Sequence, residues 1–132
     1  MVVSILILIF VSISITMTPN QIIDYVVNHF SKNPRSLNEQ GNCKYNGLNG
    51  THCAFAILCV NPKELNDGLT LNDNLIRKIA ILKPEFAGQS FQFYKDIQEL
   101  HDYGNHWIKT PEGNELTESG IYKVEKLKER YK

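Results

Sequence analysis

The sequence predicts a small α+β domain that is rich in helix and contains one short β-hairpin. Several segments carry apolar residues at helical spacing, and Ile22, Val26 and Phe30 form the clearest stripe. Residues 42–53 instead alternate apolar and polar side chains around a turn bounded by glycines. The 132 residues contain no repeat or linker and suffice for one hydrophobic core. We therefore expect residues 17–132 to form a single globular domain.

The first helix is predicted over residues 19–32. Thr18 can serve as its N-cap, Pro19 suits the first helical position, and Gln21 completes a capping box. The helix should end before Asn33-Pro34, because a proline cannot continue the hydrogen-bond ladder.

The next two elements are the hairpin and a buried helix. The hairpin turns through Gly47-Leu48-Asn49-Gly50, and Gly50 is predicted to need a positive φ. Residues 53–60 are apolar on every side, which predicts a short buried helix that ends at Asn61-Pro62.

Three more helices are predicted in the second half of the chain. They begin after Asn72, after Ser90 and near Glu118, and they end at Pro84, at residue 103 and at Tyr131. Gly104 stands where a left-handed C-cap is expected. Residues 106–117 are predicted to be either a loop or a second small hairpin.

Residues 1–16 are an apolar run that differs from the rest of the chain. The run has about the length of a signal-peptide core and is too short to span a bilayer comfortably. No lysine or arginine precedes Lys32, so the basic residues typical of a signal or anchor are missing. Three interpretations stay open: an extension upstream of a natural start at Met17, a signal or membrane anchor, or a β-strand. We favour the extension, because the capping signals after Met17 start a helix without help from upstream.

Composition narrows the classes of partner and compartment. Fourteen basic residues balance fourteen acidic ones, so no strong net field draws the chain to nucleic acid or anionic lipid. Three cysteines are an odd number and too few for a disulfide scaffold, which is typical of a reducing compartment. We expect a cytoplasmic protein without a cofactor. Export or membrane anchoring is the alternative if residues 1–16 are a true signal or anchor.

One stretch resembles a family of small bacterial and phage proteins. The shared pattern is Arg-Ser, Gly-x-Cys-x-Tyr and Gly-x-x-Cys-Ala, followed later by Leu-Gln-x-x-His-Asp. Its elements here would be Arg35, Ser36, Gly41, Cys43, Tyr45, Gly50, Cys53 and Ala54, and the segment from Ile97 to Asp102. Ala56 departs from the pattern, because the family tends to have glycine there. The family has no known activity, so the resemblance implies a shape and a phage or mobile-element source, and no mechanism.

A thiol nucleophile is the first candidate chemistry. Cys53 lies at the amino end of a predicted helix, where a thiol pKa falls, and His101 with Asp102 could supply a base and its orienting group. Because His101 and Asp102 are adjacent on a helix, their side chains start about 100 degrees apart, and we expect no direct relay between them. The alternative is that Cys53 packs as a small apolar residue, which we favour because no nucleophile signature accompanies it. A buried Cys53 sulfur would favour a binding protein over a hydrolase.

A metal site is the second candidate chemistry. Six residues carry suitable ligands, namely Cys43, His52, Cys53, Cys59, His101 and His106. Their spacing is far from the paired spacing of zinc sites, so we predict no metal site. If the chain is exported, a Cys43–Cys53 disulfide becomes the better interpretation, because both residues share one face of the predicted hairpin.

The third candidate is a recognition surface without chemistry. Arg35, Lys44, Tyr45, Asn46 and His52 are predicted to line the hairpin and the loop that leads into it. Arginine and tyrosine are the residue types that anchor interfaces with a protein or small-molecule partner. The alternative is that Tyr45 packs beneath the hairpin and that Arg35 forms a local ion pair. We therefore interpret the chain as a small non-enzymatic binding or interaction protein, with a cysteine-dependent hydrolase as the alternative.

Overall fold

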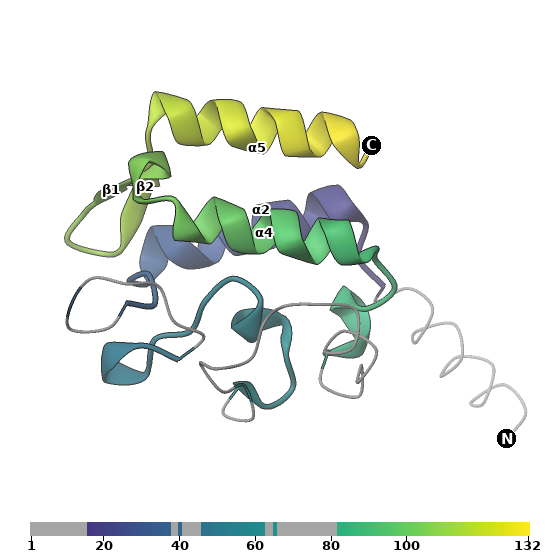
Figure 1. Ribbon diagram of the computed structural model, residues 1–132, viewed down its shortest axis with the longest axis horizontal. Coiled ribbons are helices and arrows are strands. Elements are labelled where there is room, and N and C mark those ends of the chain that lie inside the picture. The colour runs from purple at the N-terminus through teal and green to yellow at the C-terminus, as the bar shows by residue number, and fades with distance from the viewer. Residues whose placement is uncertain (1–15, 38–39, 41–45, 63–64, 66–81) are drawn as a thin grey trace, which may run out of the picture.

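Three α-helices form the main body of the computed structural model, which describes residues 16–37, 40, 46–62, 65 and 82–132. They are α2 (Pro19–Lys32), α4 (Phe91–Asp102) and α5 (Glu118–Arg130). Helices α2 and α4 run side by side, with α5 on one side of this pair and residues 46–62 on the other (Figure 1). The described part of the chain is therefore a helix-rich α+β domain, as the sequence predicts.

Each of these helices begins at a side-chain cap. The hydroxyl of Thr18 accepts a hydrogen bond from the backbone N–H of Gln21, and the side chain of Gln21 accepts one from the N–H of Thr18. Ser90 accepts from Phe93 N–H, and Thr117 accepts from Gly120 N–H. These bonds satisfy amides that have no partner inside a helix, so local sequence alone fixes where the helices start. The predicted starts at residues 19, 91 and 118 are confirmed.

The hydrophobic core lies between the helices and the irregular segment beneath them. Its fully buried members come from α2, from residues 53–59, from α4 and from α5, and they include Ile22, Val26, Phe30, Phe55, Leu58, Phe93, Ile97, Leu100 and Leu127. The apolar stripe predicted for the first helix is therefore the face that this helix buries. Helix α5 is also held by Asp96, whose buried carboxylate accepts hydrogen bonds from Arg130 (2.7 Å) and Tyr131 (2.6 Å).

The two-stranded sheet lies in the segment for which the sequence leaves a loop or a hairpin open. Strand β1 (Trp107–Lys109) pairs antiparallel with β2 (Asn114–Leu116), and Lys109 lies opposite Asn114. Of the hairpin predicted over 42–53, the described residues contain one antiparallel bridge, Asn46 to His52, around a 3-10 turn at Leu48–Gly50. Residues 42–45 of that hairpin lie outside the described residues.

Two sequence predictions are wrong in detail. Residues 53–60 are buried as expected, but they contain a 3-10 turn at Ala56–Leu58 instead of an α-helix. The chain is extended at Cys59, which forms an antiparallel bridge with Leu82. The backbone N–H of Lys83 donates to the Leu58 carbonyl beside this bridge. Gly104 is not a left-handed cap: the described glycines with positive φ are Gly50 and Gly88.

The third predicted helix, from Asn72 to Pro84, lies almost wholly outside the described residues. Pro84 itself begins a short 3-10 turn, Pro84–Phe86. Among the described residues, no helix combines the length and the apolar composition that a membrane crossing requires.

Candidate functional site

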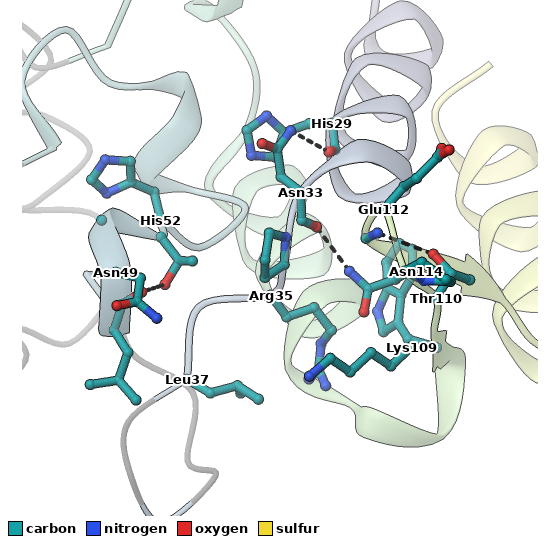
Figure 2. A pocket seen from close by; sticks show the side chains of 17 residues that line it. His29, Asn33, Arg35, Leu37, Asn49, His52, Lys109, Thr110, Glu112 and Asn114 are labelled. Carbon is teal, nitrogen blue, oxygen red and sulfur yellow. Dashed lines mark hydrogen bonds between the residues drawn. The ribbon is translucent and has the colours of Figure 1, made fainter.

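A pocket of about 590 Å³ opens where three segments of the chain meet. The end of α2 with the residues that follow it forms one wall, the turn at 48–52 forms the second, and the β1–β2 hairpin forms the third. Figure 2 shows side chains from all three segments around this space. Two residues of the predicted recognition surface, Arg35 and His52, line it.

The wall between α2 and the hairpin is held by backbone-directed hydrogen bonds. The side-chain amide of Asn114 donates to the carbonyl oxygens of Phe30 and Asn33, at 3.0 Å each. Gly113 packs so closely that an added Cβ would lie 2.7 Å from the backbone nitrogen of Asn33. The hairpin is therefore fixed against the C-terminus of α2, as Figure 2 shows for Asn33 and Asn114.

The Phe30 carbonyl needs this outside donor for a reason visible in the sequence. Its partner in a continued helix would be the amide of residue 34, and residue 34 is a proline without an N–H. Asn114 supplies the missing donor from the hairpin, 84 positions away in the chain. Pro34 thus ends α2 and at the same time creates the acceptor that docks the hairpin.

The second wall is organised by Asn46. Its side-chain nitrogen donates to the carbonyls of Pro62 (2.9 Å) and Leu65 (3.0 Å). Its side-chain oxygen is therefore left to face Nδ1 of His52, at 2.7 Å. Because that oxygen can only accept, Nδ1 of His52 carries the proton, and Nε2 is an acceptor in the neutral ring and a donor in the charged ring. The ring of His52 is oriented by a contact that does not depend on a ligand.

The turn that carries this wall has an unusual backbone. Asn49 has φ 58° and Gly50 has φ 73°, both in the left-handed region. The hydroxyl of Thr51 donates to the Leu48 carbonyl at 2.8 Å and closes the turn. The predicted positive φ at Gly50 is confirmed, and asparagine is the non-glycine residue best suited to the position before it.

The charged groups of the pocket are mainly basic. Arg35 and Lys109 are cations, Glu112 is the acidic residue among the described lining residues, and His29 and His52 add two imidazoles. Burial lowers the pKa of His29, and the fields of His52, His101 and Lys83 lower it further.

Arg35 has a structural contact in addition to its place in the wall. Its Nε donates to the His101 carbonyl at 2.9 Å, and one terminal nitrogen donates to the Asp102 carbonyl at 3.1 Å. Trp107 donates its indole N–H to the Leu100 carbonyl at 2.8 Å. These side chains occupy the last carbonyls of α4, which explains why the helix needs no glycine cap at Gly104.

Cys53 does not have the surroundings of a nucleophile. Its side chain is fully buried, and burial raises the pKa of its thiol to about 12. Its sulfur accepts a hydrogen bond from the backbone N–H of Ala56 at 3.4 Å. Cys53 and Cys59 are free thiols, whereas Cys43, the other half of the disulfide considered for an exported chain, lies outside the described residues.

His101 is buried and bonded through both ring nitrogens. Nδ1 lies 2.8 Å from the carboxylate of Asp102, and Nε2 accepts from the backbone N–H of Ser36 at 3.1 Å. The expectation of no direct relay between these two neighbours rested on their diverging side chains, and the 2.8 Å contact shows that they meet nevertheless. Asp102 is the last residue of α4, and its side-chain torsions bring the carboxylate back to the ring although the Cα–Cβ bonds diverge. The Asp102 carboxylate can only accept and the Ser36 amide can only donate, so Nδ1 carries the proton, Nε2 accepts, and the ring is neutral. Burial is the main cause of the lowered pKa of His101.

The pocket contains some of the residues predicted from sequence and others that were not predicted. Two of the predicted recognition residues line the pocket: Arg35 in the first wall and His52 in the second. Asn46 supports the second wall through its contact with His52. Lys44 and Tyr45 lie outside the described residues. Cys43 of the metal hypothesis also lies outside them, and within the described ranges no three metal-binding side chains cluster.

The third wall is the part that sequence reasoning missed. The sequence predicts no binding role for Lys109 or for the hairpin turn at 110–113, although Pro111-Glu112-Gly113 between two short apolar-containing segments is a turn signal. His29 was assigned only to the first helix. Nothing in its local sequence says that a hairpin more than 75 residues later closes over it.

Comparison of the chain with protein-family models, with curated proteins and with solved structures found no match. The resemblance to the bacterial and phage family therefore stays a prediction from the motif alone.

Proposed function

We propose that this chain is a non-enzymatic binding protein whose ligand occupies the pocket between α2, the turn at 48–52 and the β1–β2 hairpin. The observation that carries the proposal is the convergence of three distant segments on one preformed space. Its walls are fixed by the intramolecular hydrogen bonds of Asn114 and Asn46. A preformed concave site with a few oriented polar groups is the usual form of a small-ligand site.

The size of the pocket indicates the size of its occupant. A volume of about 590 Å³ falls within the range of small-molecule sites, and it also accommodates one or two side chains of a bound peptide. Leu37 and Leu48 give the lining an apolar part beside the polar one. We therefore expect a ligand of drug-like size or a short peptide segment.

The surroundings of the thiol support binding over hydrolysis. A cysteine hydrolase needs an accessible thiolate that shares a hydrogen bond with its base. Cys53 is buried with a raised pKa, and the ring nitrogens of His101 are bonded to Ser36 and Asp102. The Ser36 bond uses the backbone amide, which occupies the lone pair that a general base would need.

A fragment screen with matched tryptophan variants tests the proposal. Leu48 (47% exposed) lines the pocket, whereas Val60 (60% exposed) is an aliphatic residue of the same segment outside the pocket. Ligand-observed NMR with a library of acidic, basic and neutral fragments should give hits with the wild-type chain and with Val60→Trp. Leu48→Trp should lose them, because the indole fills the space. If no hit depends on Leu48, the pocket is not the binding site and the proposal fails.

Thiol alkylation provides the test against the hydrolase. Iodoacetamide at neutral pH should modify Cys53 of the folded chain slowly, and rapidly after denaturation, because a buried thiol with a raised pKa supplies little thiolate. Rapid alkylation of folded Cys53 that disappears in His101→Gln would contradict the proposal and favour the hydrolase.

A further inference from the structure

Two cations, Arg35 and Lys109, and one acidic residue, Glu112, line the pocket of a chain whose formal net charge is zero. Two basic side chains outside the pocket are neutralised: Lys128 pairs with Asp24, and Arg130 pairs with Asp96 at 2.7 Å. Within the described part of the chain, Lys109 makes no ion pair. It extends from β1 into the space that Arg35 also borders (Figure 2).

We propose that the pocket binds an anionic ligand, a carboxylate or phosphate monoester carried on a small apolar body. This inference rests on the proposed function, because it names the class of ligand for the same site. An oxyanion is the group that a lysine ammonium and the N–H donors of imidazole and guanidinium bind best.

Three groups have distinct roles in this recognition. Lys109 supplies a mobile ammonium on an exposed strand residue that can reach the anion. Arg35 supplies positive charge from a fixed position, because two of its donors are already bonded to the C-terminal carbonyls of α4. His52 is oriented through Nδ1 by Asn46, which leaves its Nε2 to face the ligand.

The neighbouring fields agree with this assignment. The positive charge of Lys83 lowers the pKa of His29, and the exclusion of water at the pocket wall strengthens such fields. An anion in the pocket would oppose those fields and raise the pKa of His29. Glu112 is the negatively charged residue of the described lining, and it lies on the exposed hairpin turn. Its carboxylate would weaken anion binding, because it would compete with the ligand for the ammonium of Lys109.

The apolar residues of the lining indicate the chemistry of the uncharged part of the ligand. Pro34, Leu37 and Leu48 line the pocket beside the basic groups. A flat ring or short alkyl group would cover them, whereas a fully hydrated inorganic ion would leave them exposed to water. We therefore expect an aromatic or aliphatic acid to bind more tightly than inorganic phosphate.

Four small probes of one shape and different charge test the inference. Phenyl phosphate, benzoate, benzylamine and benzyl alcohol are titrated separately into the ¹⁵N-labelled chain, and amide shifts of Gly50, Lys109 and Gly113 report binding. Phenyl phosphate or benzoate should shift these amides with an affinity about tenfold or more above that of the other two, as one charge-assisted hydrogen bond provides. The comparison between phosphate and carboxylate identifies which oxyanion the site prefers.

Charge variants supply the matched controls. Lys109→Gln should weaken binding of the better anion by about tenfold, whereas Lys95→Gln, the same change at an exposed α4 residue outside the pocket, should leave it within about twofold. Glu112→Gln should strengthen binding. His29, followed by its imidazole ¹H signals, should titrate at higher pH when the anion is present.

The outcomes separate the two proposals. If benzylamine or benzyl alcohol shifts the pocket amides as strongly as the anions do, the pocket binds ligands and the anionic class is wrong. Equal effects of Lys109→Gln and Lys95→Gln would also refute the anionic class. If none of the four probes and no fragment of the wider screen shifts these amides, both the ligand class and the proposed function fail.

Discussion

Replacing Asn114 by alanine should destabilise the whole domain, because one side chain joins the hairpin to the end of α2. The amide of Asn114 is buried and donates to the carbonyls of Phe30 and Asn33 at 3.0 Å each. The Phe30 carbonyl lies in a buried position and loses its normal helical donor to Pro34. After truncation it would have neither partner, whereas the more exposed Asn33 carbonyl can turn to water.

The cost follows from these two carbonyls. An unsatisfied buried acceptor costs about 1–3 kcal/mol, and the loss of the partly exposed bond adds about 0.5 kcal/mol. We expect Asn114→Ala to lower the free energy of unfolding by about 1.5–3.5 kcal/mol, measured by urea denaturation with a common m-value. For a domain of this size the melting temperature should fall by about 10 °C.

Asn114→Asp is the matched control, because it keeps the shape and removes the donor. At neutral pH its carboxylate would face two carbonyl oxygens and should cost more than alanine does. The carboxyl pKa would be raised in the folded chain, so the deficit should narrow as the pH falls and the folded state takes up the proton. An alanine variant with an unchanged urea midpoint, or an aspartate variant more stable than the alanine variant at pH 7, would refute this account.

Three further predictions concern single residues. Gly50→Ala should lower the free energy of unfolding by about 1 kcal/mol in a denaturant melt, because φ 73° is unfavourable for alanine. The added Cβ itself would meet no atom within 4 Å, so the cost is one of backbone conformation. An unchanged midpoint would contradict the turn geometry. Cys53→Ser should lower the free energy of unfolding by about 1–3 kcal/mol, because a hydroxyl is less well suited than a thiol to a fully buried apolar site. Equal stability of the wild-type and Cys53→Ser chains would show that water reaches this side chain. Burial lowers the pKa of His101 in the folded chain, so the unfolded chain binds more protons below about pH 6.5, and stability should fall as the pH is lowered through this range. His101→Gln, which keeps an acceptor for Ser36, should be less dependent on pH between about 6.5 and 5 by thermal melting; an identical pH profile would rule out His101 as the source.

Local sequence alone determined where α2, α4 and α5 start and which face of α2 is buried. Thr18, Ser90 and Thr117 each bond an amide within three residues of themselves, so their capping role needs no information from the rest of the chain. The stripe from Ile22 to Phe30 is likewise a property of helical spacing. The positive φ of Gly50 follows from turn chemistry in the same way.

Tertiary structure decided how the helices end and where the pocket forms. The last carbonyls of α2 and α4 are satisfied by Asn114 and by Arg35, donors that lie 84 and 66 positions away, so no local pattern announces them. The contact between His101 and Asp102 also depends on side-chain torsions that helical spacing does not specify. The candidate site has the same origin, because a pocket is the space between segments. Sequence identified side chains that border it, while only the packing of the hairpin on α2 determined that they enclose one volume.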